Sequence, residues 1–266
     1  MQNSQVKAAA LYEGTFSVGA DHKFNRIQRD AQPQKGTLKL SINPFLINDG
    51  NRNILFDAGL GDLIGDDTSI HTLINNLAEH SVAEYEVTDI FISHLHLDHF
   101  AGIAHRENGY WELTFPDAVI YVSEQGWKKL AESIANEGDD AYNFYHFIDA
   151  KANLHFLNED AVPIPNVRVK RIGGHTEFHQ AMFFDNGHQR YLMAGDVIGR
   201  RIAMNRSFVA KFDYEPEKSK IMRDDLKKMA YQNQFTIMAY HETDHPMFIL
   251  TEFSEKAGYT IKPVTG

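Results

Sequence analysis

The segment FISHLHLDHFAG, residues 91–102, constrains this chain more than any other stretch of its sequence. Four side chains that can bind a metal lie within six residues there, directly after an apolar run typical of a strand: His94, His96, Asp98 and His99. Because side chains alternate along a strand, His94 and His96 lie on the same side, while Asp98 and His99 lie in the turn beyond. Imidazole and carboxylate are standard ligands of zinc and related ions. One short segment can therefore supply two adjacent metal positions.

Further candidate ligands follow other apolar runs of the chain. Asp57 follows NILF, His175 follows VKRIGG, Asp196 follows YLMAG and His241 follows FTIMAY. Taken singly, each of these is more often an ordinary core, surface or turn residue. Beside the cluster at 94–99 they become credible, because a pair of metal ions needs ligands from several strand ends. His245 competes with His241 for the last position, and we prefer His241 because it follows its strand directly.

Composition limits what kind of protein this is. The chain has 266 residues, a net charge of -10, 14 histidines and no cysteine. Without cysteine, a metal must be held by nitrogen and oxygen, and neither a disulfide nor a thiol nucleophile exists. The acidic balance argues against a nucleic-acid partner. No apolar run approaches the ~18 residues that span a bilayer, and the N-terminus lacks a signal-peptide pattern, so we expect a cytoplasmic protein with no membrane partner.

The hydrophobic pattern predicts a mixture of strands and helices in one domain, residues 1–266. Alternating or continuous apolar runs predict strands at 6–12, 14–19, 37–46, 53–56, 89–93, 118–122, 167–172, 180–184, 190–193 and 235–239. Helical spacing predicts helices at 69–79, 127–136, 140–148 and 218–231. The C-terminal end, HPMFILTEFSEKAGYTIKPVTG, is strand-like. This order favours two sheets packed together with helices outside.

The segment 94–99 resembles the HxHxDH signature of the metallo-β-lactamase superfamily, and the order of the other candidate ligands resembles that family's motifs from about residue 53 to 245. The resemblance implies an α+β fold, a four-layer αββα sandwich of two mixed sheets with a dinuclear metal site at one edge. It implies a first ion bound by His94, His96 and His175, a second bound by Asp98, His99 and His241, and Asp196 bridging both. Asp57 would brace the ligand loop without binding metal.

Two divalent ions bring four positive charges, and Asp98 and Asp196 cancel only two of them. Such a site favours a transition state that gains negative charge. Metal ions lower the pKa of bound water to roughly 7 and polarise a carbonyl or phosphoryl oxygen. We therefore expect a hydrolase in which a metal-bridging hydroxide attacks an ester or lactone carbonyl. Asp98 is the candidate catalytic residue, holding the nucleophile and passing a proton to the leaving group. Zinc is the first choice of metal, and manganese, iron or cobalt also suit nitrogen and oxygen ligands.

The substrate class rests on the same resemblance. The commoner β-lactamases of the family use a cysteine ligand, which this chain lacks. The closest likeness is to the lactonase-like branch, which includes acyl-homoserine lactonases and organophosphate hydrolases. Those lactonases have a tyrosine shortly after the bridging aspartate, whereas this chain reads DVIGR at 196–200. Candidate pocket residues, each as readily an ordinary core or surface residue, are His22, Phe24, His146, Arg200 and Phe208.

Alternatives remain open. The first alternative keeps the same fold and changes the substrate: a phosphodiester, a phosphotriester or a thioester in place of an ester or lactone. A different class of function is a mononuclear iron dioxygenase or a non-catalytic metal-binding protein, although the full ligand set argues against both. The expected partner is a small-molecule substrate, and a homodimer is left open.

Overall fold

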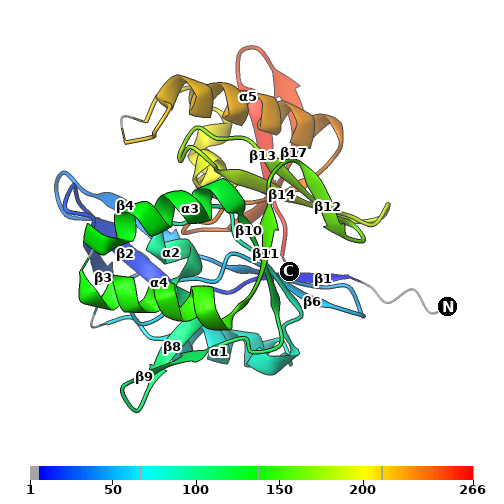
Figure 1. Ribbon diagram of the computed structural model, residues 1–266. Coiled ribbons are helices and arrows are strands. Elements are labelled where there is room, and N and C mark those ends of the chain that lie inside the picture. Colours follow the sequence, from blue (N-terminus) through cyan, green and yellow to red (C-terminus); the bar gives the residue numbers. More distant parts are fainter. Residues whose placement is uncertain (1–5, 66, 137, 211, 266) are drawn as a thin grey trace. The chain divides into compact units, whose positions relative to one another are not determined.

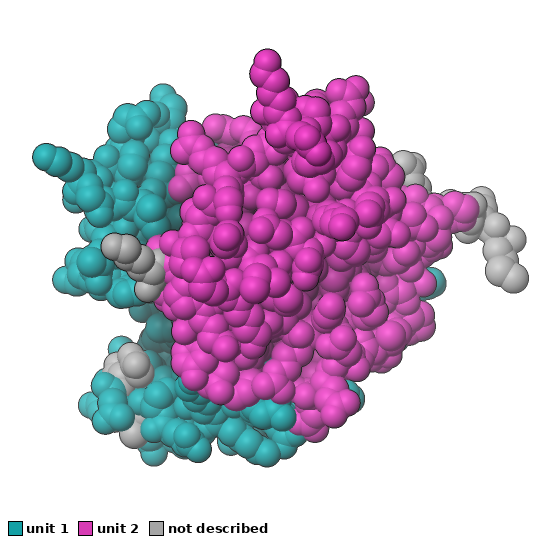
Figure 2. Space-filling model, turned by 90° about the horizontal axis from the view of Figure 1, so that it is seen from above, with its two compact units in different colours: residues 1–156 teal, residues 157–266 magenta. Residues whose placement is uncertain are grey.

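The computed structural model describes residues 6–65, 67–136, 138–210 and 212–265. The chain forms two compact units, residues 1–156 (unit 1) and 157–266 (unit 2), coloured separately in Figure 2. The predicted single domain over 1–266 stays a prediction. In the described part of the chain, no helix combines the length and the apolar character that crossing a membrane requires.

Unit 1 is built on a six-stranded sheet with the order β1-β5-β6-β7-β10-β11 (Figure 1). Its strands are β1 (Lys7–Ala10), β5 (Phe45–Asn48), β6 (Asn53–Phe56), β7 (Asp89–Phe91), β10 (Val119–Ser123) and β11 (Asn153–Leu157). Strand β7 pairs in parallel with both β6 and β10. The carboxyl ends of parallel strands reach the same sheet edge, so the residues after Phe56 and after Phe91 emerge side by side.

Helices cover one face of this sheet. They are α1 (Ile70–Glu79), α3 (Glu124–Ser133) and α4 (Asp139–Lys151). In α1, Ile70, Leu73 and Leu77 recur at helical spacing, are buried, and belong to the core cluster that also holds Leu55 and Ile90 of the sheet. Burying each such side chain stabilises the fold by about 1.5–3 kcal/mol. The apolar stripe thus both selects a helix and attaches it to the sheet.

The predicted single strand over 37–46 is wrong. The structure divides it into β4 (Leu38–Ile42) and β5, which belong to different sheets. Pro44 lies between them and has no N–H to continue a ladder. Strand β4 pairs with β2 (Gly14–Val18), which also pairs with β3 (Phe24–Ile27), a strand that the sequence pattern did not predict.

Unit 2 is built on a seven-stranded sheet with the order β12-β13-β14-β15-β16-β17-β18. Its strands are β12 (Ala161–Ile164), β13 (Val167–Arg171), β14 (Gln180–Asp185), β15 (Arg190–Met193), β16 (Thr236–Met238), β17 (Met247–Ser254) and β18 (Gly258–Pro263). Strands β13 and β15 both run antiparallel to β14, and β16 runs parallel to β15. Strands β13, β15 and β16 therefore run in the same direction and end at the same sheet edge.

Helix α5 (Pro216–Gln232) packs on this sheet through Leu226 and Ala230, which share a core cluster with Phe183 and Ile237. Pro216 stands in its first turn, where the missing N–H costs no helical hydrogen bond. The predicted helices and the strand-like C-terminal end are confirmed. Among the elements that the pattern did not predict are α2 (Leu97–Phe100), β8 (Ala104–Glu107) and β9 (Tyr110–Leu113), which are too short to show a clear period.

Candidate metal centre

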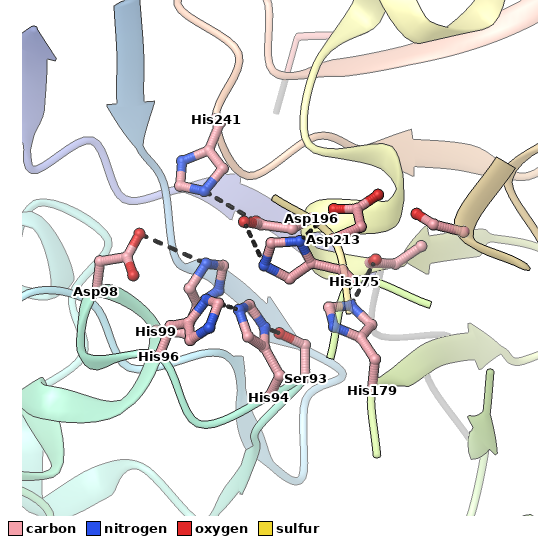
Figure 3. A network of polar contacts seen from close by, with 12 residues as sticks. Ser93, His94, His96, Asp98, His99, His175, His179, Asp196, Asp213 and His241 are labelled. Atoms are coloured by element: carbon pink, nitrogen blue, oxygen red, sulfur yellow. Dashed lines mark hydrogen bonds and ion pairs between the residues drawn. The ribbon is translucent and has the colours of Figure 1, made fainter. Parts of the chain in front are cut away.

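His94 and His96 follow strand β7 and direct ring nitrogens at each other. His94 Nε2 lies 2.9 Å from His96 Nδ1, with His94 buried and His96 exposed (Figure 3). The Ser93 hydroxyl, which lies 3.0 Å from His94 Nδ1, donates its own hydrogen to Asp57. His94 Nδ1–H therefore donates to the Ser93 oxygen, and this leaves the lone pair on His94 Nε2.

Asp98 and His99 lie in the short helix α2 and form a second pair in unit 1. His99 Nε2 lies 3.6 Å from Asp98 Oδ2, and both residues are buried. His99 Nδ1 lies 2.6 Å from Asp57 Oδ2, so this ring donates to Asp57 and keeps its Nε2 lone pair toward Asp98.

Asp57, at the end of β6, holds the ligand segment in place. Its carboxylate accepts hydrogen bonds from the Ser93 N–H at 2.6 Å, the Ser93 hydroxyl at 2.7 Å and His99. Burial raises the pKa of Asp57, and the hydrogen bonds from His99 and Ser93 oppose that rise. The Asp57 backbone is left-handed, with φ 60°, a conformation that an Asp tolerates better than most residues. Asp57 therefore contacts Ser93 and His99 of the predicted ligand segment, and its bracing role stays a prediction.

His175 lies in the loop after β13, where Gly173 and Gly174 take φ values of 64° and 95° that favour glycine. Its Nδ1 lies 2.8 Å from Asp213 Oδ1, and its Nε2 lies 3.2 Å from Asp196 Oδ2. His175 is buried. As in His99, one ring nitrogen faces a carboxylate of the scaffold and the other faces a predicted ligand.

Asp196 follows β15 and uses both of its oxygens. Oδ2 faces His175, and Oδ1 lies 2.8 Å from His241 Nε2. His241 follows β16, which runs parallel to β15, so the two side chains emerge at the same edge. His241 is buried, whereas His245 is exposed. The structure thus brings His241 to Asp196, and its role as the last ligand stays a prediction.

The donor atoms fit divalent ions. Two ligands of one tetrahedral ion, each about 2.0–2.1 Å from it, lie about 3.3 Å apart. The two donor atoms within each described pair lie 2.8–3.6 Å apart. The pairs are His94–His96 and Asp98–His99 in unit 1, and His175–Asp196 and His241–Asp196 in unit 2. The donors are imidazole nitrogens and carboxylate oxygens, which suit zinc and its neighbours. Within each unit the predicted ligands therefore form pairs whose donor atoms are spaced as two ligands of one ion would be.

The candidate pocket residues occupy varied positions. His22 is exposed in a turn, Phe24 packs its ring 5.6 Å from that of Phe16, and His146 is exposed on α4. Arg200 is partly buried just after the loop that carries Asp196. Phe208 is 40% exposed, with the Arg223 guanidinium 4.1 Å from its ring centroid. The pocket role of each stays a prediction.

Three polar residues near the predicted ligands gave no signal in the sequence. Ser93 and Asp213 contact predicted ligand histidines, but neither was singled out from the sequence, although Ser93 directly precedes His94. Glu13 is buried, and its Oε2 accepts a hydrogen bond from the Leu60 N–H at 3.3 Å. Its other oxygen has no hydrogen-bond partner among the described residues. A buried acid of this kind is visible only after folding, because the residues around it come from distant parts of the chain.

Burial raises the pKa of Glu13 from 4.5 to about 8, with Leu60 and Arg26 opposing and Asp98 adding to the rise. Since the unfolded chain loses this proton first, the unfolding free energy should fall as the pH rises from about 4.5 to about 8. Glu13→Gln cannot ionise, so its unfolding free energy should lack this fall, which amounts to a few kcal/mol at most. Urea unfolding at pH 5 and pH 8, in chelator-treated protein, measures the difference.

The exposed Glu132→Gln is the matched control for Glu13→Gln and should keep the wild-type pH dependence. Parallel pH dependences in Glu13→Gln and the wild type would contradict a neutral Glu13 in the folded state.

Comparisons with known proteins agree with this geometry. A family model, the Metallo-beta-lactamase superfamily, matches residues 38–241. A hydroxyacylglutathione hydrolase of Haemophilus ducreyi is 32% identical over 112 residues, which are 42% of this chain and 36% of that enzyme. The match thus spans about a third of that relative's length.

Two solved structures share the fold over the whole chain. The hydrolase AbOPH of the beta lactamase superfamily has a TM-score of 0.77 at 23% identity, covering 100% of this chain and 97% of that chain. AidC, a dizinc quorum-quenching lactonase, has a TM-score of 0.75 at 18% identity, with the same coverage. The predicted αββα fold class is confirmed.

These findings agree with the predicted metal-dependent hydrolase. The family model covers most of the chain and includes all the histidines and aspartates predicted as ligands. The chain belongs to the metallo-β-lactamase superfamily.

Proposed function

We propose that this protein is a dinuclear metal-dependent hydrolase that opens a carboxylic ester or lactone. The ligand sets of both units would hold two divalent ions. The first ion would be held by His94, His96 and His175. The second ion would be held by Asp98, His99 and His241, and Asp196 would bind both ions. Zinc is the proposed metal, since it accepts this mixture of nitrogen and oxygen donors.

The arrangement of Asp196 carries the proposal. Its two oxygens face two different histidines, at 3.2 Å and 2.8 Å, which is what a carboxylate shared by two ions requires. A carboxylate serving a single ion has no need to present both oxygens to separate imidazoles. The Asp196 side chain is partly exposed.

When bound, two ions of this kind make water a nucleophile near neutral pH and polarise the carbonyl under attack. The chain's own residues supply orientation and proton transfer. Asp57 keeps His99 in the tautomer whose Nε2 lone pair faces Asp98, because it accepts the Nδ1 hydrogen. Asp98 lies in α2 and its side chain keeps 12% of its surface exposed, so its carboxylate can hold an attacking water and hand a proton to the leaving alcohol.

A lactone or ester is the leading substrate class because the fold is shared with AidC, whose substrate is a lactone. The lactonase tyrosine is absent from 196–200, so another group would have to contact the carbonyl; partly buried Arg200 is the nearest candidate in sequence. A thioester is the second candidate. The 32% identity to a hydroxyacylglutathione hydrolase favours it, although that match covers only 112 residues.

A turnover panel on the zinc-loaded protein tests the proposal. Lactones, aryl esters, thioesters, phosphotriesters and phosphodiesters would be compared, with bound metal measured by elemental analysis. We expect two ions per chain and turnover of lactones or aryl esters. His96→Ala should lose this activity about 1000-fold or more, because a missing ligand removes an ion worth several kcal/mol to the transition state. The exposed His188→Ala is the matched control and should keep wild-type activity.

Hydrolysis of phosphodiesters alone would overturn the substrate class. One bound iron with oxygen consumption would indicate the dioxygenase alternative, and two bound ions without any turnover would indicate a metal-binding protein.

A further inference from the structure

We propose that Asp213 is a positioning residue for the ligand His175. It fixes the imidazole in the tautomer with the hydrogen on Nδ1, so that the Nε2 lone pair is directed at the metal. This inference rests on the proposed function, because it takes His175 as a ligand. Nothing in the sequence motif assigns a role to Asp213, which lies 38 residues from His175.

The contact itself is short and buried. His175 Nδ1 lies 2.8 Å from Asp213 Oδ1, and their side chains are 5% and 3% exposed (Figure 3). A carboxylate can only accept, so the ring must donate from Nδ1. The opposite nitrogen, Nε2, is the one that lies 3.2 Å from Asp196 Oδ2. Asp213 therefore selects the ring nitrogen that faces the bridging aspartate.

The backbone holds Asp213 and His175 in register. The Tyr214 N–H donates to the His175 carbonyl at 3.0 Å, and the Glu215 N–H donates to the Gly174 carbonyl at 2.8 Å. Gly174 packs so closely that a Cβ there would lie 2.7 Å from the Ser219 Cα. The carboxylate thus reaches His175 from a segment that two backbone hydrogen bonds and one close contact keep in place.

A buried carboxylate also needs a compensating charge. Arg223 of α5 carries such a charge and is 2% exposed: burial lowers the pKa of its guanidinium, and the charge of Asp213 opposes that lowering. The Arg223 guanidinium donates to the Val197 carbonyl at 2.8 Å and to the Phe208 carbonyl at 3.0 Å. Arg223 therefore ties the segment with Asp196 to the segment before Asp213.

Unit 1 contains the same arrangement. Asp57 accepts from His99 Nδ1 just as Asp213 accepts from His175 Nδ1, and in both pairs the carboxylate comes from a distant part of the chain. Carboxylates that accept from the second nitrogen of a metal-bound histidine raise its basicity and fix its orientation, and losing one typically weakens metal binding 10–100-fold. Asp213 fills that role for a histidine in unit 2.

Zinc titration of the chelator-stripped full-length chain, in competition with a chromophoric chelator, tests the inference. Asp213→Ala should bind at least one of two zinc ions 10–100-fold more weakly. Asp213→Asn keeps an acceptor of the same shape and should lose less, about 10-fold. Long-range ¹⁵N–¹H spectra of the zinc-loaded protein should show His175 with hydrogen on Nδ1 in the wild type and in Asp213→Asn. Asp185→Asn, which alters an exposed ion pair in the same unit, should bind zinc like the wild type.

Two zinc ions held with equal affinity by the wild type and both Asp213 variants would overturn the role of Asp213 and leave the proposed function intact. A wild-type chain that binds no zinc, manganese, iron or cobalt would overturn both. If Asp213→Ala fails to fold, Asp213→Asn and the tautomer spectrum decide alone: hydrogen on Nε2 of His175 in the wild type would contradict the inference.

Discussion

Asp196→Ala is expected to abolish hydrolysis, with a loss of kcat/KM of about 1000-fold or more. Asp196 faces both His175 and His241, so its removal takes away a ligand that the proposed site uses twice. The two imidazoles would then face each other without the negative charge that balances bound cations. We also expect fewer than two zinc ions per chain, measured by elemental analysis after dialysis.

Asp196→Asn separates charge from shape. The amide keeps the size of the side chain but offers only one oxygen, so it can serve one histidine-bound ion and not both. Its activity should fall nearly as far as that of Asp196→Ala. Asp225→Ala, at an exposed position of α5, is the control and should leave kcat/KM and the metal content unchanged. Activity within tenfold of the wild type in Asp196→Ala, with two ions retained, would refute a bridging role.

Gly102→Ala is expected to lower stability by about 3 kcal/mol or more, a large effect for one methyl group. A Cβ at Gly102 would lie 1.9 Å from the Ala58 carbonyl oxygen, which is a backbone atom and cannot rotate away. Gly102 also donates its N–H to the Gly59 carbonyl, so the clash falls where the segment with the ligand cluster contacts the turn after β6. Relief of the clash must separate these two backbones.

Thermal and urea unfolding measure this effect, and we expect a melting midpoint about 5–10 °C lower. Gly65→Ala is the matched control, because a Cβ there meets nothing within 4 Å. It should change the midpoint by no more than about 2 °C. Separation of the backbones would also displace Asp57 from His99, so Gly102→Ala should bind metal more weakly. Equal midpoints for the two glycine variants would show that the contact is looser than the structure indicates.

Much of the secondary structure followed from periodicity. Helices α1 and α5 and the strands that precede the ligands were predictable, because buried faces repeat with a period of 3.6 or 2. The division of 37–46 was not predicted. Both of its halves are apolar and strand-like, and only the separate pairing partners of β4 and β5 show that the chain leaves one sheet for another at Pro44. Strand pairing is a long-range property that a local pattern does not contain.

The candidate site divides in the same way. The ligand types, their order and the choice of His241 over His245 stay predictions, and the structure places the candidates His94, Asp196 and His241 just after strands β7, β15 and β16. The carboxylates that orient the ligands were only partly predictable. Asp57 was predicted from the family motif, whereas Asp213 has no comparable sequence context. Glu13, whose pKa is raised to about 8, was also missed, because burial is a property of the folded chain.

The sequence by itself determined the chemistry of the site: nitrogen and oxygen ligands without any thiolate, placed at the ends of strands in the order of a known superfamily. The tertiary structure decided which atoms act together. His99 meets a carboxylate 42 residues away and His175 meets one 38 residues away, and in each case the contact leaves Nε2 directed at another ligand. The physical reason is that ligand identity is a property of single side chains, whereas a tautomer, a pKa or a shared carboxylate depends on neighbours that only the pairing of distant strands brings into contact.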